Sequence, residues 1–347
     1  MKKIKKMVVL LLPVMLCLSG CQKTQETEKT KTEVGIALYN EKDAFLGSII
    51  KNVFTVVRDP EEAFDNLELE MQDAAADQLL QNSQIRRFID IKCDVLCANL
   101  VDRTSAGSIV SAAKDADIPV IFFERQPVEQ DIEWYEKAYY LGSDAKESAR
   151  LQAQIVLDAW KKDPSSIDIN GDGVVSYVIL EGERGHQDAA IRTEYVVKAL
   201  EEGGMKLQKV EGGSANFDRT QAEALMERWL GQEDFYTELV LANNDEMALG
   251  AVEAVEKKQT EVKKKKQKQY LKNIKIAGID GTDEAKKAVD DGKMLGNVCS
   301  DQKLYAKTLL EMVEAVKNGE KLEDCIEDAD TDGNYVWIPW EIYVKKE

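Results

Sequence analysis

Cysteine is too scarce in this sequence, and too widely spaced, to suggest a disulfide framework. Two of the six cysteines lie in the N-terminal segment. Cys93 and Cys97 are four residues apart on an apparent strand, about 13 Å at ~3.3 Å per residue, which is too far for a disulfide. Cys299 and Cys325 could pair only if the fold happened to bring them together. We therefore expect these four cysteines to be buried thiols.

The sequence also has fewer basic than acidic residues. The chain has 46 Lys and Arg against 64 Asp and Glu, which gives a formal net charge of −18. Four of the lysines lie within the first six residues, so a mature chain without them stands at −22. Such a surface disfavours nucleic acids and anionic substrates, and a neutral ligand is the more natural expectation.

The N-terminal apolar run is too short to form a stable transmembrane helix. A basic stretch, MKKIKK, precedes the run MVVLLLPVMLCL, a pattern typical of a signal peptide. The residues LSGC at 18–21 resemble a bacterial lipobox, in which Cys21 becomes the lipidated first residue of the mature protein. An ordinary signal peptide with an incidental cysteine is the alternative. We expect a signal peptide over 1–20, a lipid anchor and flexible tether over 21–33, and a location on the outer face of the cytoplasmic membrane.

Beyond the tether, short apolar runs alternate with longer segments of helical period. The apolar runs cover 34–39, 67–72, 94–100, 118–123, 174–180, 239–243, 274–279 and 294–300. The helical segments include 78–90, 147–160, 189–202, 221–230 and 246–258. Near-continuous apolar strands that alternate with helices predict parallel sheets covered on both faces. At about 150 residues per domain, the sequence predicts an α/β protein with two Rossmann-like lobes.

Polar and aromatic residues follow many of the predicted strands. Open parallel sheets bind ligands at the carboxyl ends of their strands, where loops meet helix N-termini. The residues expected there are Asp43, Phe45, Asn99, His186, Asp188, Arg192, Phe217, Asn244, Asp280 and Ser300. Planar Asp, Asn and Arg groups can satisfy sugar hydroxyls with paired hydrogen bonds, and aromatic rings can cover the apolar faces of a pyranose. The set therefore suits a neutral polyol.

Each of these residues also has a simpler structural explanation. Asp43, Asn244 and Asp280 could be helix N-caps, and Asp188 with Arg192 could be a surface ion pair on a helix. The two phenylalanines could be core residues, and the single histidine could be a solvated loop residue. Their shared position at one edge of both predicted sheets favours a binding site.

A calcium-type loop occurs at 168–179, DINGDGVVSYVI. It begins with the pattern D-x-[DN]-x-[DN]-G, in which the twelfth position is normally a bidentate Glu. Here the twelfth residue is Ile179, within an apolar run. Either the loop binds no ion, or the missing carboxylate comes from elsewhere in the chain.

These motifs together resemble those of bacterial galactose/glucose-binding proteins, which have the type I periplasmic-binding-protein fold and serve sugar ABC transporters and chemoreceptors. The resemblance runs from about Val34 to Val344. It is strongest in KAYYLGSDAKES, in ANNDEMALGAVEAV and in the run G-H-x-D-x-x-x-R after the calcium-type loop. It implies a monomeric binding protein, not an enzyme, that takes D-galactose or D-glucose between its lobes and delivers the sugar to a transporter permease.

The resemblance also implies where the lobes and the sugar ligands lie. Three hinge crossings are expected near Ile118, Ser300 and Val336. The N-terminal lobe would then comprise 34–118 and 301–336, and the C-terminal lobe 119–300 and 337–347. All ten residues named above correspond to sugar-binding positions of the family. Two depart from its usual residues, because Phe217 stands where the family often has Trp and Ser300 where it commonly has Asn.

In this family the interrupted loop is a calcium site, and its bidentate carboxylate comes from a distant strand. By position that residue is Glu238. The ligands implied by the resemblance are Asp168, Asn170, Asp172, the backbone carbonyl of Val174, Ser176 and Glu238. The short Ser176 side chain could bind the ion through a water molecule, as the ninth position of such loops often does.

Two further charged segments have simpler interpretations. DADTDGNY, which begins at Asp328, also has the D-x-D-x-D-G pattern, but its twelfth position is Pro339 and a strand-like run follows. We interpret it as an Asp-Gly turn that opens a hairpin or hinge strand, not as an ion site. The lysine-rich run at 257–268 is expected to be a solvated loop. Contact with an anionic membrane surface is the alternative.

Other functions remain to be distinguished. A secreted carbohydrate hydrolase would need a carboxylic acid of raised pKa, and Arg192 beside Asp188 is expected to favour the ionised form. A lipoprotein that presents sugar to a chemoreceptor or a histidine kinase would have the same site, so the sequence does not separate it from a transport protein. A transcriptional repressor is excluded by the signal peptide and the missing helix-turn-helix.

Overall fold

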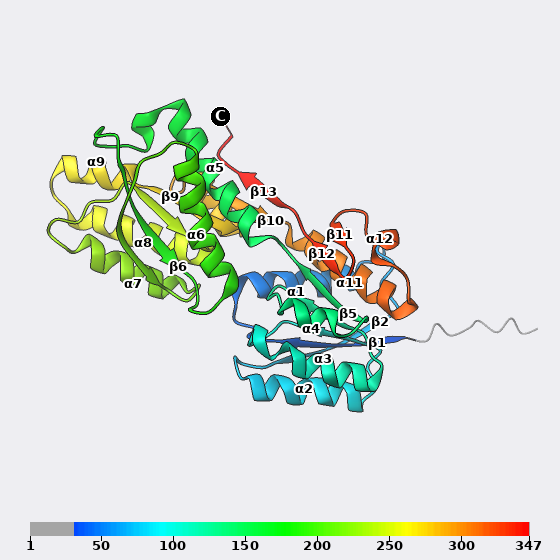
Figure 1. Ribbon diagram of the computed structural model, residues 1–347. Coiled ribbons are helices and arrows are strands. Elements are labelled where there is room, and N and C mark those ends of the chain that lie inside the picture. The colour runs from blue at the N-terminus through cyan, green and yellow to red at the C-terminus, as the bar shows by residue number, and fades with distance from the viewer. Residues whose placement is uncertain (1–30, 347) are drawn as a thin grey trace, which may run out of the picture. The chain divides into compact units, whose positions relative to one another are not determined.

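The computed structural model describes residues 31–346, which contain two β-sheets. The first sheet has seven strands in the order β11-β12-β5-β4-β3-β1-β2, and the second has six in the order β13-β10-β9-β8-β6-β7 (Figure 1). The predicted signal peptide, the lipidation site Cys21 and most of the tether lie outside the described residues. Within residues 31–346, no helix has the length and apolar character needed to cross a membrane.

The first sheet is mainly parallel. Its strands are β1 (Thr32–Leu38), β2 (Leu67–Asp73), β3 (Val95–Ala98), β4 (Val120–Phe123), β5 (Ala138–Gly142), β11 (Asp330–Asp332) and β12 (Tyr335–Trp337). Only β11 pairs antiparallel, with β12. The associated helices are α1 (Ala44–Val57), α2 (Gln78–Asp90), η1 (Arg103–Ser105), α3 (Ala106–Ala116), α4 (Glu129–Glu133), α11 (Gln302–Asn318) and α12 (Leu322–Cys325). Helices α1 and α11 bury apolar residues in one core cluster, and α2 and α3 in another.

The second sheet is built in the same way. Its parallel strands are β6 (Val175–Glu181), β7 (Leu207–Ser214), β8 (Leu239–Ala242), β9 (Lys275–Asp280) and β10 (Gly296–Ser300). The last strand, β13 (Trp340–Tyr343), pairs antiparallel with β10. The helices are α5 (Ala145–Lys162), η2 (Pro164–Ser166), α6 (Gln187–Glu202), α7 (Arg219–Leu230), α8 (Asp245–Glu261), α9 (Lys265–Asn273) and α10 (Asp283–Asp290).

The predicted α/β class with two lobes is confirmed. Strands β3, β4 and β8 are buried along their whole length, as expected for parallel strands covered on both faces. Separate core clusters lie on the α5–α6 side and on the α7–α8 side of the second sheet. Each sheet is therefore covered by helices on both faces.

The first hinge crossing does not lie near Ile118, and this expectation is wrong. Strands β4 and β5 both pair within the first sheet, and the chain reaches the second lobe only between Gly142 and the start of α5. The apolar run at 118–123 contains β4, which pairs with β3 on one edge and with β5 on the other. The chain is therefore still within the first sheet at this point. The N-terminal lobe thus extends to Gly142.

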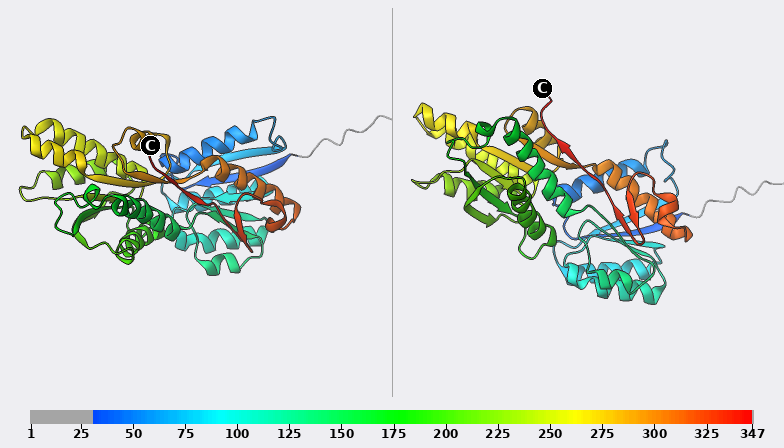
Figure 2. Two further views of the ribbon diagram at one scale, coloured as in Figure 1. Left: turned by 90° about the horizontal axis from the view of Figure 1, so that it is seen from above. Right: turned by 45° about the horizontal axis from the view of Figure 1, so that its top comes forward.

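The other two crossings lie close to the expected residues. One falls between Ser300, the last residue of β10, and α11. The other falls between β12 and β13, which lie in different sheets (Figure 2). Trp337, the last residue of β12, pairs within the first sheet. Gly333 has a φ of 58° in the turn that joins β11 to β12, and the predicted Asp-Gly hairpin is confirmed.

All four cysteines in the described residues are free thiols. Cys93, Cys97 and Cys299 are buried, in agreement with the prediction, whereas Cys325 is only partly buried. Burial raises the pKa of Cys93 to about 11 and that of Cys299 to about 12. These groups therefore stay protonated and unreactive at neutral pH.

Candidate functional site

A cleft lies at the carboxyl ends of the strands and is lined by residues of both lobes. Eight of the ten predicted sugar-binding residues line it: Asp43, Phe45, His186, Asp188, Arg192, Phe217, Asn244 and Asp280. Five further residues complete its wall: Glu124, Arg125, Ser143, Tyr305 and Trp340. The rule that placed polar residues at strand ends therefore identified most of one continuous surface.

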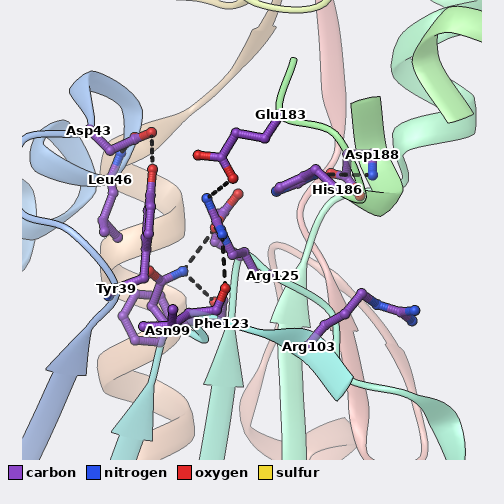
Figure 3. A network of polar contacts seen from close by, with 12 residues as sticks. Tyr39, Asp43, Leu46, Asn99, Arg103, Phe123, Arg125, Glu183, His186 and Asp188 are labelled. Carbon is purple, nitrogen blue, oxygen red and sulfur yellow. Dashed lines mark hydrogen bonds and ion pairs between the residues drawn. The ribbon is translucent and has the colours of Figure 1, made fainter. Parts of the chain in front are cut away.

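Asp43 has a structural role and also lines the cleft. Its Oδ1 accepts a hydrogen bond from the Leu46 N–H at 2.8 Å, which caps α1. Its Oδ2 accepts a bond from the Tyr39 hydroxyl at 2.7 Å (Figure 3). Phe45, the second predicted residue on this helix, packs edge-on against Tyr305 with ring centroids 6.5 Å apart. Asp43 therefore is a helix N-cap and also lines the cleft, and its contact with a sugar stays a prediction.

Asn99 does not line the cleft, in contrast to the prediction. The side chain is completely buried, and its Oδ1 accepts a bond from the Tyr39 N–H at 3.3 Å. Its Nδ2 donates to the Phe123 carbonyl at 3.0 Å and to Glu124 Oε2 at 2.8 Å (Figure 3). Because the amide is used by the protein itself, Asn99 positions Glu124, and Glu124 is the residue that reaches the cleft.

Glu124 and Arg125 are cleft residues that the sequence analysis missed. They follow β4 directly, so applying the strand-end rule to this strand would have found them. The Arg125 guanidinium stacks on the Tyr39 ring at 3.6 Å from its centroid. It lies 3.1 Å from Glu183 Oε2 in the other lobe and 3.8 Å from Glu124 Oε2. Burial, more than the opposing effect of Arg125, raises the pKa of Glu124 to about 7.

His186 and Phe217 form an aromatic corner of the cleft. The two rings meet edge to face with centroids 5.1 Å apart. His186 Nδ1 accepts a bond from the Asp188 N–H at 3.2 Å, which caps α6. Burial, together with three nearby arginines, lowers the pKa of His186 to about 3. The imidazole is therefore neutral, and its Nε2 can donate to a ligand oxygen.

Arg192 is the cation at the centre of the second lobe's half of the site. It is 7% exposed and lies 3.7 Å from Asp188 Oδ2 and 3.9 Å from Asp280 Oδ1. Its Nη1 donates to the Asn243 carbonyl at 2.9 Å. Within the described residues its buried Nε has no hydrogen-bond partner. An acceptor from outside the chain would satisfy this group.

The expected effect of Arg192 on Asp188 is outweighed. Arg192 does lower the pKa of Asp188, as expected from the sequence, but burial raises it by more, so the net direction is upward. The pKa of Asp280 is also raised, well above its usual range, by burial and then by the nearby Asp245. Burial therefore makes loss of the proton unfavourable for both Asp188 and Asp280.

The remaining predicted residues divide between the cleft and the core. Asn244 caps α8 by accepting a bond from the Met247 N–H at 3.0 Å, and it also lines the cleft. Asp280 is not a helix cap, because Thr282 caps α10. Ser300 is completely buried beside Trp340 in the β10–β13 pairing and does not line the cleft.

The calcium-type loop lies against Glu238, as the resemblance implied. Glu238 directly precedes β8 and is completely buried. Its Oε1 accepts a bond from the Asn170 N–H at 3.1 Å, and its Oε2 accepts one from the Ser176 N–H at 2.9 Å. Asp168 accepts bonds from two glycine N–H groups of the loop. The donor set consists only of oxygens, which suits Ca²⁺.

The metal site itself stays a prediction. In residues 31–346, no three or more His, Cys, Asp and Glu side chains are gathered as a metal ion would require. The carboxylates of the loop are directed at backbone N–H groups. Glu238 is nevertheless fully buried and is not in an ion pair with any described residue. Such a carboxylate is costly without a cation.

Comparison with known proteins identifies the class of this chain. A family model described as a periplasmic binding protein domain matches residues 34–321. A D-galactose/methyl-galactoside-binding periplasmic protein of Haemophilus influenzae is 31% identical over 288 residues, which cover 83% of this chain and 82% of that protein. The chain belongs to the family of type I periplasmic sugar-binding proteins of ABC transporters.

Two other relatives have different ligands in their names. A putative rhizopine-binding protein of Rhizobium meliloti is 28% identical over 311 residues, 89% of this chain and 88% of that one. The structure of an ABC-transporter solute-binding protein of Bacillus halodurans with bound myo-inositol is 29% identical, with a TM-score of 0.72. The structural alignment covers 92% of this chain and 96% of the Bacillus halodurans chain. The family is thus shown, and the ligand varies within it.

Proposed function

We propose that the protein binds a hexose in the cleft, with D-galactose and D-glucose as the first candidates, and delivers it to the permease of an ABC transporter. The observation that carries this proposal is the convergence of Asp188, Arg192 and Asp280 with the aromatic rings of Phe45 and Phe217 on one cleft. The similarity to a galactose-binding relative supports it. No bond is made or broken in this function.

The polar groups of the cleft match the chemistry of sugar hydroxyls. Each hydroxyl donates and accepts, and the cleft offers carboxylate acceptors beside the guanidinium donors of Arg125 and Arg192. Aromatic rings can cover the apolar faces of the sugar. Because the two lobes each supply part of this set, a sugar favours the form in which both halves are in contact with it.

Isothermal titration calorimetry of residues 22–347 tests the proposal. D-glucose and D-galactose are titrated separately, with D-ribose as the control and with the chain loaded with calcium. The expected result is one-to-one binding of at least one hexose and no heat from ribose. No binding of either hexose to a folded sample would contradict the hexose assignment and leave the family intact.

We also propose that lipidation of Cys21 holds the protein at the outer face of the cytoplasmic membrane and that Ca²⁺ occupies the loop at 168–176. The lipobox-like LSGC supports the first, and the buried Glu238 beside the loop supports the second. Labelling cells with a fatty-acid analogue should mark the parent chain but not a Cys21→Ala variant. Equal labelling of both would contradict the anchor.

A sensory role is the alternative partner assignment, because a chemoreceptor or histidine kinase would use the same sugar-loaded form. Capture of membrane proteins from the native cell on the immobilised, sugar-loaded chain separates the two. Recovery of a transporter permease supports transport, and recovery of a receptor ectodomain supports sensing.

A further inference from the structure

Glu124 is held in a constrained position in the wall of the cleft. Its φ of 64° lies in the left-handed region, which is unusual for a residue other than glycine. Its N–H donates to the Tyr305 hydroxyl at 2.8 Å and to the Leu141 carbonyl at 3.0 Å. Its own carbonyl accepts a bond from the Tyr140 hydroxyl at 2.8 Å. A backbone conformation of this kind is maintained only where its surroundings enforce it.

Among residues 31–346, the side chain of Glu124 has a single direct hydrogen-bond donor. That donor is Asn99 Nδ2, which contacts Oε2 at 2.8 Å (Figure 3). Oε1 accepts no hydrogen bond from the described residues, and the side chain is 20% exposed, at the cleft. One carboxylate oxygen therefore remains free to accept a bond from a ligand.

The cleft as a whole has more acidic than basic groups. Four carboxyls line it, those of Asp43, Glu124, Asp188 and Asp280, against the two guanidiniums of Arg125 and Arg192. Arg125 is shared with Glu183, which lies outside this cleft. His186 does not correct the balance, because burial keeps it neutral.

The two carboxyls of the first lobe have fewer cationic contacts than the two of the second lobe. Arg192 lies between Asp188 and Asp280, so those two carboxyls have a cation beside them. Asp43 has no ion pair among the described residues, and its hydrogen bonds come from the neutral Tyr39 hydroxyl and the Leu46 N–H. Glu124 has only a distant and shared partner in Arg125, at 3.8 Å. A cation from outside the chain would relieve both carboxylates.

The cleft wall also contains a buried donor without a partner among the described residues. The Nε of Arg192, a side chain that is more than nine-tenths buried, has no partner in the described residues. A ligand that fits must therefore supply an oxygen acceptor near Arg192. The same ligand would meet the uncompensated carboxylates of the first lobe at its other side.

We propose that the cleft prefers a hexose or cyclitol that carries a protonated amino group over its neutral parent, and that Glu124 with Asp43 receives the ammonium. This inference rests on the proposed function, because it concerns the ligand of the same cleft. Hydroxyls of the ring bind Arg192 and the carboxyls beside it, and the ammonium donates charge-assisted bonds to the free oxygen of Glu124.

The test is calorimetry of residues 22–347 at pH 7, where the ammonium of an amino sugar is mostly protonated, with matched pairs of ligands. Each pair consists of a neutral hexose, D-glucose or D-galactose, and its derivatives with an amino group in place of the hydroxyl at C2, C3, C4 or C6. The corresponding N-acetyl derivatives are the uncharged controls. At least one amino sugar should bind about tenfold tighter than its parent, and N-acetylation should remove the gain.

Two variants assign the preference to Glu124. In Glu124→Gln the ratio of the amino-sugar affinity to the neutral-sugar affinity should fall about tenfold. Glu233→Gln makes the same change of net charge on an exposed loop and should leave the ratio as in the parent. Circular dichroism of both variants establishes that they are folded, and the ratio is read only within one variant.

The outcomes separate this inference from the proposed function. Binding of neutral hexoses without tighter binding of any amino sugar would overturn the inference and support the proposed function. A preference that persists unchanged in Glu124→Gln would overturn the role of Glu124. Failure of every ligand, neutral or aminated, to bind the folded parent would overturn both.

Discussion

Arg192 shows how one side chain organises half of the site. Its guanidinium lies within 4 Å of two carboxyls, Asp188 and Asp280, and it is anchored by the Asn243 carbonyl. Asp280 is 4% exposed and has a φ of 135°, a strained value for a residue with a side chain. Strain of this kind is often found at binding sites. These three groups form a preorganised set of donors and acceptors.

Replacing Asp280 with Asn should weaken hexose binding about 10- to 100-fold. The amide replaces one carboxyl oxygen with an NH2 group, which presents a fixed donor where a sugar hydroxyl needs an acceptor, a loss of roughly 1–3 kcal/mol. Calorimetry with the tighter-binding hexose measures the loss. Asp188→Asn should behave in the same way. If both variants bind as well as the parent, the assignment of the site residues is wrong.

Glu124 makes the stability of the ligand-free protein depend on pH. Its pKa is raised to about 7 by burial, by Asp43 and by Asp188, against the opposing effects of Arg125 and the Asn99 bond. The folded chain thus holds a proton that the unfolded chain releases near pH 4.5. Stability from this group is fully present below that pH and is lost as the pH rises through about 7, by roughly 2–3 kcal/mol.

Thermal unfolding at pH 5.5 and at pH 8 measures this effect. The parent should melt at a higher temperature at pH 5.5, and the difference should be smaller in Glu124→Gln, whereas Glu233→Gln should retain it. Other buried carboxyls with raised pKa values, Asp188, Asp245 and Asp280, contribute in the same direction. An unchanged difference in Glu124→Gln would show that these carboxyls account for all of it.

At the scale of elements, the loop at 168–176 is connected to two strands by one carboxylate. Glu238 precedes β8 and accepts N–H bonds from Asn170 in the loop and from Ser176 in β6. Its Oε2 also accepts a hydrogen bond from the Ser176 hydroxyl at 3.0 Å. A cation in the loop would therefore stabilise the pairing of β6 with β8.

Glu238→Gln should lower the melting temperature clearly in calcium and only slightly in a chelator. The amide retains the size of the side chain but loses the charge and one of the acceptors that a cation needs. Differential scanning calorimetry in the two buffers makes the comparison. An equal loss in both buffers would indicate that Glu238 acts through packing and its N–H bonds alone.

Much of the architecture could be predicted because buried parallel strands have a simple pattern. The runs that became β3, β4 and β8 are apolar along their length and lie between helices. The strand β7 was missed, because LQKVEGGS lies at the edge of its sheet and has no continuous apolar run. The strand β5 was missed as well. The lobe boundary near Ile118 came from the family resemblance and is wrong because β4 and β5 both pair within the first sheet.

The site was predictable to the extent that it follows strand ends. Residues such as Asp43, Asn244 and Asp280 lie there because of the local sequence. Asn99 and Ser300 also lie at strand ends but do not reach the cleft. Asn99 is bound to Glu124, 25 residues away in the chain, and Ser300 is covered within the β10–β13 pairing. Contacts between distant segments decide such cases, and a single sequence does not reveal them.

At the scale of the whole molecule, two pairs of side chains connect the lobes beside the cleft. Arg125 Nη2 of the first lobe lies 3.1 Å from Glu183 Oε2 of the second. Gln126 Oε1 accepts a bond from Gln187 Nε2 at 3.0 Å. These contacts hold the two lobes together at the edge of the cleft, and Glu183, Gln126 and Gln187 do not line it.

Glu183→Gln should therefore weaken sugar binding only two- to fivefold. A half-exposed ion pair contributes about 1 kcal/mol or less, and losing it lowers the fraction of the chain in the form that binds. Small-angle scattering of the ligand-free variant should show a larger radius of gyration than the parent, with Glu233→Gln as the control. Identical scattering and identical affinity would contradict a role for this pair in closure.

The most direct test of the central claim is a crystal structure of residues 22–347 with the tighter-binding hexose. The account predicts one sugar in the cleft, with hydroxyls bonded to Arg192 and Asp280 and the ring beside Phe45 or Phe217. A structure with the sugar elsewhere, or with an empty cleft at a saturating sugar concentration, would contradict it.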